Sequence, residues 1–245
     1  ADRIDLDLRV SAAQATAGAI QLADVAAAAQ VKNGLAVFDI SDASAFGGNI
    51  QSSLRFDRKP EGTQVEIRLL ASDIDGGAFG TAAGMTRLVP IGTGTVSVIL
   101  KGPGRTWDSI FENADGSVSA KFGQGALSRF NLPAFLKHNE QGGFFALDDV
   151  SDGTLPIDGA ELKASISNGV AKIDKAEANS AKYKIWLSGI ASYAGRGLAL
   201  SGGIIQADQQ ATQTNSQGPN QSSFFIGGTW STPFISPISR GVSGE

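Results

Sequence analysis

The sequence predicts a mainly β protein, built on one long, curved antiparallel sheet with two or three short helices. Three observations indicate this class: repeated runs of alternating apolar and polar residues, turn-forming Asn-Gly and Asp-Gly pairs, and 31 Gly beside only 18% charged residues. Alternation with a period of two places one row of side chains on a buried face. The runs follow one another too closely for the helical crossovers that parallel strands need, which favours an antiparallel meander.

The alternating runs recur along most of the chain. In order, they cover residues 6–10, 35–40, 49–56, 64–69, 94–100, 118–122, 161–166, 183–187, 198–200 and 224–226. Pairs that favour tight hairpin turns, because both residues readily take a positive φ, lie at Asn33-Gly34, Asp115-Gly116, Asp152-Gly153, Asp158-Gly159 and Asn168-Gly169. The segments 33–53 and 168–188 share seven identities over 21 ungapped positions, so we predict an internal repeat of one strand pair.

Helix signals are few. Residues 106–112 begin with a Thr cap candidate and place Trp107, Ile110 and Phe111 at helical spacing. Residues 131–138 begin with Asn131, carry Pro in the first turn and are followed by two Gly. A third, weaker helix is predicted over 79–89. Short amphipathic helices beside a large sheet typically cover part of one of its faces.

The chain is predicted to form one continuous domain. Residues 1–205 hold the repetitive sheet and its short helices, residues 206–223 form a polar loop, and residues 224–245 form a final strand and a tail in which 232–237 leave the sheet. The alternating pattern begins within the first ten residues, with no signal peptide or membrane anchor before it. We therefore expect the C-terminal part of a longer protein.

Composition excludes several chemistries. Without Cys and with a single His, the chain has no thiolate metal site and no His pair, and a net charge of −4 argues against nucleic acid as partner. His138 is expected at a helix end on the surface, and the string 72–76 fails as a calcium loop because Ala occupies the required carboxylate positions. Turn formation explains the acidic group Asp148, Asp149, Asp152 and Asp158. We predict no enzyme activity and no catalytic, metal or cofactor site.

The alternating runs combine into one apolar face. Its predicted members are Phe38, Ile40, Ile50, Leu54, Phe56, Val65, Ile67, Leu69, Val96, Val98, Leu100, Phe122, Ile166, Ile185 and Leu187. Such a face must either be buried within the protein or serve as a binding surface. Two interpretations follow from the pattern: a core filled by the protein's own side chains, or a groove whose aliphatic lining holds acyl chains.

Several phrases resemble the C-terminal region of AsmA-family proteins. They lie at 33–50, 94–102, 107–119, 155–159 with 168–169, and in Ile226-Gly-Gly-Thr-Trp-Ser-Thr-Pro233, which is similar to the family's closing G-G-T-w-x-x-P. The resemblance implies a periplasmic protein of Gram-negative bacteria, usually anchored in the inner membrane by an N-terminal helix. It also implies a taco-like β-groove involved in phospholipid transport and outer-membrane biogenesis.

The leading hypothesis is therefore a non-catalytic lipid-binding or lipid-bridging module. Its expected partners are phospholipid or another acyl-chain lipid, and envelope proteins, with membrane contact through parts outside this chain. A second hypothesis is a scaffold that assists outer-membrane protein assembly through exposed strand edges. A third, an enzyme or adhesin on a β-solenoid, requires a regular short coil that the repeat spacing does not provide.

Overall fold

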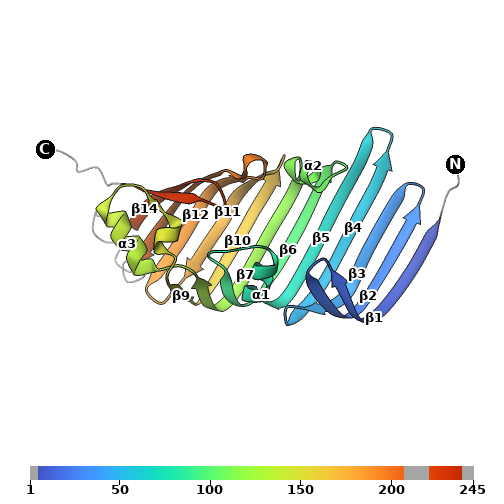
Figure 1. The fold of residues 1–245 in the computed structure, drawn as a ribbon, viewed down its shortest axis with the longest axis horizontal. Coiled ribbons are helices and arrows are strands. Elements are labelled where there is room, and N and C mark those ends of the chain that lie inside the picture. Colours follow the sequence, from blue (N-terminus) through green and yellow to red (C-terminus); the bar gives the residue numbers. More distant parts are fainter. Residues whose placement is uncertain (1–4, 207–220, 239–245) are drawn as a thin grey trace, which may run out of the picture.

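The computed structural model describes residues 5–206 and 221–238, which form one open antiparallel sheet of 15 strands with three α-helices (Figure 1). The strands are β1 (Leu6–Ala17), β2 (Ile20–Lys32), β3 (Leu35–Ala45), β4 (Gly48–Lys59), β5 (Gly62–Asp75), β6 (Pro90–Pro103), β7 (Asp115–Ser128), β8 (Phe145–Ala146), β9 (Thr154–Ile157), β10 (Gly159–Ser167), β11 (Val170–Asn179), β12 (Tyr183–Ser192), β13 (Leu198–Gln206), β14 (Gln221–Gly228) and β15 (Pro233–Pro237). The α-helices are α1 (Gly76–Ala82), α2 (Trp107–Glu112) and α3 (Leu132–Gln141), and the 3₁₀ helices are η1 (Leu147–Val150) and η2 (Ala194–Arg196). The predicted fold class is confirmed.

Neighbours in the sheet are mostly neighbours in the chain. The order runs from β1 to β7, then from β10 to β15, and ends on β8, while β9 pairs separately with β7. One edge is the long strand β1, and the other is the two-residue strand β8. The sheet is thus a meander with one detour, α3 to β9, inserted between β7 and β10.

Two of the five predicted turn pairs are tight hairpin turns. Asn33-Gly34 and Asn168-Gly169 both take positive φ, at 52° and 83° and at 47° and 68°, and each is followed by a strand pair that contains a register shift. Asp115-Gly116 instead begins β7, which corrects the turn prediction there. Asp152-Gly153 and Asp158-Gly159 flank β9; since β9 and β10 follow one another along the same edge of β7, neither pair closes a hairpin.

The two stronger helix predictions are confirmed. Thr106 caps α2 by accepting a hydrogen bond from the backbone N–H of Ser109, and Asn131 caps α3 by accepting one from Ala134. The third helix lies earlier than the predicted 79–89, because Asp75, at the end of β5, supplies its cap and starts α1 at Gly76.

The C-terminal segment departs from its prediction. Residues 232–237 do not leave the sheet, because β15 pairs with both β14 and β8, and its Ile235 is fully buried. The two Pro occupy the ends of this strand, where a missing N–H is tolerated. Strand β14 begins three residues before the predicted 224. Most of the predicted polar loop, residues 207–220, lies outside the described residues.

Hydrogen-bonded rows across the sheet define its two faces. Phe38, Leu54, Ile67 and Leu100 pair in sequence across β3, β4, β5 and β6, so their side chains share one face. We call this the inner face. All three α-helices lie against it, as the packing of α3 on β14 illustrates.

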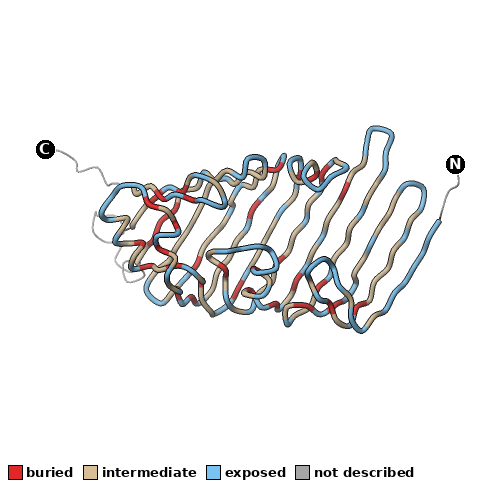
Figure 2. The backbone as a smooth tube through the Cα atoms, in the orientation of Figure 1, coloured by how far each residue is buried: buried red, intermediate tan, exposed pale blue. Residues whose placement is uncertain are grey.

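Buried residues form two clusters on the inner face. One lies at the C-terminal end, between α3, β8, η1 and strands β11–β15, and the other lies beside α1, where β2–β7 contribute. Figure 2 shows the same division and, between and beyond the clusters, long stretches of strand that are exposed or half-buried. The inner face is therefore covered at some places and open at others.

Close packing of α1 on the sheet leads to a testable prediction. A Cβ at Gly76 would lie 2.0 Å from the carbonyl oxygen of Pro90, so Gly76→Ala forces α1 away from β6. We expect a loss of about 1–3 kcal/mol in the free energy of unfolding, measured with urea. Gly197→Ala is the control, because its added Cβ meets no atom within 4 Å and its φ is −80°. A Gly76 variant as stable as this control would contradict the prediction.

Candidate functional site: an apolar groove

Strand register places all fifteen residues of the predicted apolar face on the inner face. The row that begins at Phe38 continues from Leu100 through Gly116 to Ile166. A second row passes from Phe122 through Ala160 and Ala178 to Ile185. The first row brings together residues that are more than a hundred positions apart in the chain. That these residues bind lipid stays a prediction.

Exposure along this face is graded. Of the fifteen, Ile50, Val65, Val96 and Phe122 are buried, Phe38 is 46% exposed, and the remaining ten are half-buried. A core filled by its own side chains would bury most of them. The face is instead an apolar groove that is half-buried over much of β3–β6, covered beside α1, where Ile50 and Val96 are buried, and closed at its C-terminal end.

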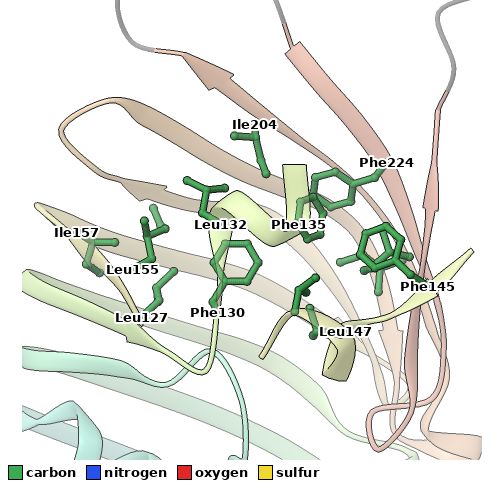
Figure 3. Packing of buried hydrophobic residues seen from close by; sticks show 14 residues of the cluster. Leu127, Phe130, Leu132, Phe135, Phe145, Leu147, Leu155, Ile157, Ile204 and Phe224 are labelled. Carbon is green, nitrogen blue, oxygen red and sulfur yellow. The ribbon is translucent and has the colours of Figure 1, made fainter. Parts of the chain in front are cut away.

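The closed end is built by aromatic packing. Phe135 of α3 is 2% exposed, and its ring lies 4.9 Å from that of Phe224, 5.4 Å from Phe145 and 5.5 Å from Phe130. Figure 3 shows Phe135 directed from α3 toward Phe224 on β14, with Leu132 beside it. The helix therefore seals the inner face over the last strands.

A cavity of about 370 Å³ lies where the groove meets this seal. Its walls come from α1, α3 and η1, from the segments that follow α1 and β7, and from strands β6, β7 and β10–β15. Among the described residues that line it, Glu161 and Glu177 are the two ionisable ones, and both belong to outer-face rows. The volume is within the range of small-molecule sites, roughly 300–1,000 Å³.

The predicted residues divide between the cavity and the open groove. Val96, Phe122, Ile185 and Leu187 line the cavity, whereas the other eleven lie outside its wall. The prediction missed Val118 and Leu162, although both are in phase with apolar residues of the alternating runs. It also missed lining residues contributed by helices and connecting segments and by Ala positions of the strands: Phe79, Met85, Leu88, Phe130, Phe135, Ala120, Ala160, Ala176 and Ala178.

Charges gather on the outer face. Glu161 accepts a 2.7 Å hydrogen bond from Lys175 and lies 3.3 Å from the ammonium of Lys163, and the hydrogen bond from Lys175 lowers the pKa of Glu161 below its ordinary value. Glu177 pairs with Lys184 in the same region. Such solvent-exposed pairs contribute little stability. Their effect here is to make one face of the sheet polar while the other stays apolar.

One ion pair joins the two sides of the cavity. Arg87, in the segment between α1 and β6, donates two hydrogen bonds to the carboxylate of Asp148 in η1, at 2.6 and 2.7 Å. The hydrogen bond from Arg87 lowers the pKa of Asp148, and the pKa of Arg87 is raised in turn. The pair thus links the α1 side of the cavity to the cap at its closed end.

Acid should weaken this link. Because the pKa of Asp148 is lower in the folded than in the unfolded protein, its contribution to stability is complete above about pH 4 and is lost as the pH falls through the lowered value. We expect the melting temperatures of wild type and Arg87→Gln to differ at pH 7 and to converge as the pH falls through the lowered pKa of Asp148.

NMR titration of the Asp148 carboxyl should show its pKa returning toward about 3.9 in Arg87→Gln. Arg129→Gln is the matched control, since Arg129 acts on Asp148 only through a smaller Coulomb interaction. An equal shift in both variants would contradict a specific role for Arg87.

None of the helices within residues 5–206 and 221–238 combines the length and the apolar character needed to cross a membrane. Comparison with protein-family models gave no match, and neither did comparisons with curated proteins and with solved structures.

Proposed function

We propose that this chain is a non-catalytic module that binds lipid in its apolar groove. The observation that supports the proposal is the half-buried inner face, which is continuous with a cavity lined by apolar side chains. Monomeric proteins rarely leave a large contiguous apolar surface in water unless it has a binding role. An acyl chain is a ligand that such a surface accepts without any polar group to orient it.

Acyl-chain burial supplies the binding energy in this proposal. Each methylene removed from water contributes about 0.8 kcal/mol. Neighbouring strands lie about 4.8 Å apart, so the inner face from β1 to β7 extends over roughly 30 Å, comparable with the hydrocarbon thickness of a bilayer. An acyl chain lying across the strands is shielded by the inner face, while its headgroup stays in water at the open side.

The resemblance to AsmA-family proteins extends this proposal to a cellular role. We propose that the chain acts in the periplasm of a Gram-negative bacterium, in phospholipid transport and outer-membrane biogenesis, as part of a longer protein anchored in the inner membrane. In that setting the groove spans the space between two membranes, and lipid moves along it.

Lipid analysis tests the proposal. Organic-solvent extraction of the purified protein, followed by mass spectrometry, is expected to recover phospholipid or another acyl-chain lipid. The delipidated protein is expected to bind a fluorescent fatty acid that unlabelled phospholipid displaces. A lipid-free preparation that also fails to bind the fluorescent fatty acid would overturn the proposal.

A second function, a scaffold for outer-membrane proteins, is favoured by one specific observation. Across the described part of the chain, no strand pairs with the outer edge of β1, whose twelve residues carry few charges. An unpaired edge of this length can accept another strand. Crosslinks from β1 to a partner protein, with no lipid in the groove, would favour this function.

A further inference from the structure

Four aromatic side chains form a continuous cluster at one rim of the sheet. The rings of Trp107 and Phe111 in α2 stack at 6.1 Å, Phe111 lies 5.4 Å from Tyr193, and Tyr193 lies 6.0 Å from Trp230. They come from α2, from the β12–η2 junction and from the β14–β15 turn. We call this cluster the aromatic rim.

The aromatic rim does not serve the core. Of the apolar residues that give α2 its helical spacing, only Ile110 packs against the sheet, at 4% exposure. Trp107 is 51% exposed and Trp230 is 42% exposed. Two of the protein's three Trp thus present their rings to solvent at the same edge.

Backbone hydrogen bonds hold this rim in place. The N–H of Gly169 donates to Ala114 after α2, the N–H of Tyr193 donates to Gly169, and the N–H of Trp230 donates to Arg196. The hydroxyl of Tyr193 also donates to Asp108 at 3.0 Å. Three separate connections and α2 are therefore tied into one platform that presents the rings in a fixed arrangement.

We propose that the aromatic rim docks this protein onto the interfacial layer of a lipid bilayer. Trp and Tyr rings have an apolar body and a polar edge, and they concentrate at the level of lipid headgroups for that reason. Exposed Arg105 and Arg196 adjoin the cluster and can meet lipid phosphates. The exposed acids Asp108 and Glu112 of α2 lie beside them, Asp108 being held by the hydroxyl of Tyr193. A bilayer also fits a cluster at one rim, since an extended surface can contact all three segments that carry the rings at once.

Docking at this rim is separate from binding in the groove. Figure 1 shows α2 and α1 at opposite ends of the strands. The rim lies at the α2 end, whereas Val96 and Ala120, which line the cavity, pair in the middle of β6 and β7, and α1 contributes to the cavity wall. The proposal therefore goes beyond the proposed function, and each can fail without the other.

Vesicle flotation tests the docking. Wild type is expected to float with vesicles of phosphatidylcholine and phosphatidylglycerol, and Trp107→Ala/Trp230→Ala is expected to reduce the bound fraction at least fivefold. Trp186→Phe is the control, because Trp186 lies on the outer face about 20 Å from the rim along β12. Ala120→Asp, which changes the groove alone, is expected to float like wild type.

Quenching by lipids with brominated acyl chains locates the contact. In variants that retain one Trp, the fluorescence of Trp107 is expected to fall by at least half on vesicle binding, and that of Trp186 to stay unchanged. Equal quenching at the two positions, or flotation unaffected by the double variant, would overturn the proposal. Wild type that fails to float would overturn it as well and would leave a protein surface as the partner of the rim.

Discussion

Replacing Ala120 with aspartate is expected to reduce the lipid that co-purifies with the protein at least tenfold. Ala120 lies on the inner face of β7, in the row of Val96 and Leu162, and lines the cavity. A carboxylate there must stay hydrated or lose several kcal/mol of solvation when an acyl chain covers it. About 1.4 kcal/mol corresponds to a tenfold change in affinity. Even a fraction of the lost solvation energy therefore decides whether lipid occupies the groove.

Ser119→Asp is the matched control. It adds the same charge to the same strand, one residue away, on the outer face, and is expected to keep wild-type lipid. Ala176→Asp repeats the test two strands away on the same row. Circular dichroism and the melting temperature establish that the variants fold. Folded Ala120 and Ala176 variants that retain wild-type lipid would contradict a binding role for the inner face.

Truncating Phe135 is expected to have the largest effect on stability. Its ring is buried against three other aromatic rings at the closed end of the groove, so Phe135→Ala leaves a cavity that the sheet cannot collapse to fill. Such truncations cost about 3–5 kcal/mol. Urea unfolding monitored by circular dichroism measures the loss.

Phe144→Ala is the control for this experiment. Phe144 follows α3 closely in the chain, but it is 81% exposed, so its truncation is expected to change the free energy of unfolding by less than about 0.5 kcal/mol. Equal losses in the two variants would show that α3 does not seal the groove as described.

Local patterns in the sequence predicted most strands, but not β2. Residues 23 and 26–29 of that strand are Ala, which has low β-propensity and gives no alternation of large apolar and polar residues. Pairing with β1 on one side and β3 on the other nevertheless makes β2 a strand of thirteen residues. Tertiary pairing overrode local propensity here, as it did for β15 at the C-terminus.

The sequence could also predict which residues share the apolar face. Alternation is a property of neighbouring residues, and the tight turns at Asn33-Gly34 and Asn168-Gly169 keep successive strands in register. Cavity residues such as Phe130 and Phe135 could not be assigned this way. They belong to an excursion between β7 and β10, and nothing in their own spacing indicates which strands they meet.

By itself, the sequence determined that this protein is an antiparallel sheet with one apolar face, because side-chain alternation and turn chemistry act over a few residues. Only the tertiary structure decided which part of that face is covered. Coverage depends on contacts such as that of Phe135 with Phe224, which are 89 positions apart and are set by the path of the whole chain. The same long-range contacts leave much of the inner face only half-buried and place two exposed Trp side chains at one rim, which are the two features on which the functional proposals depend.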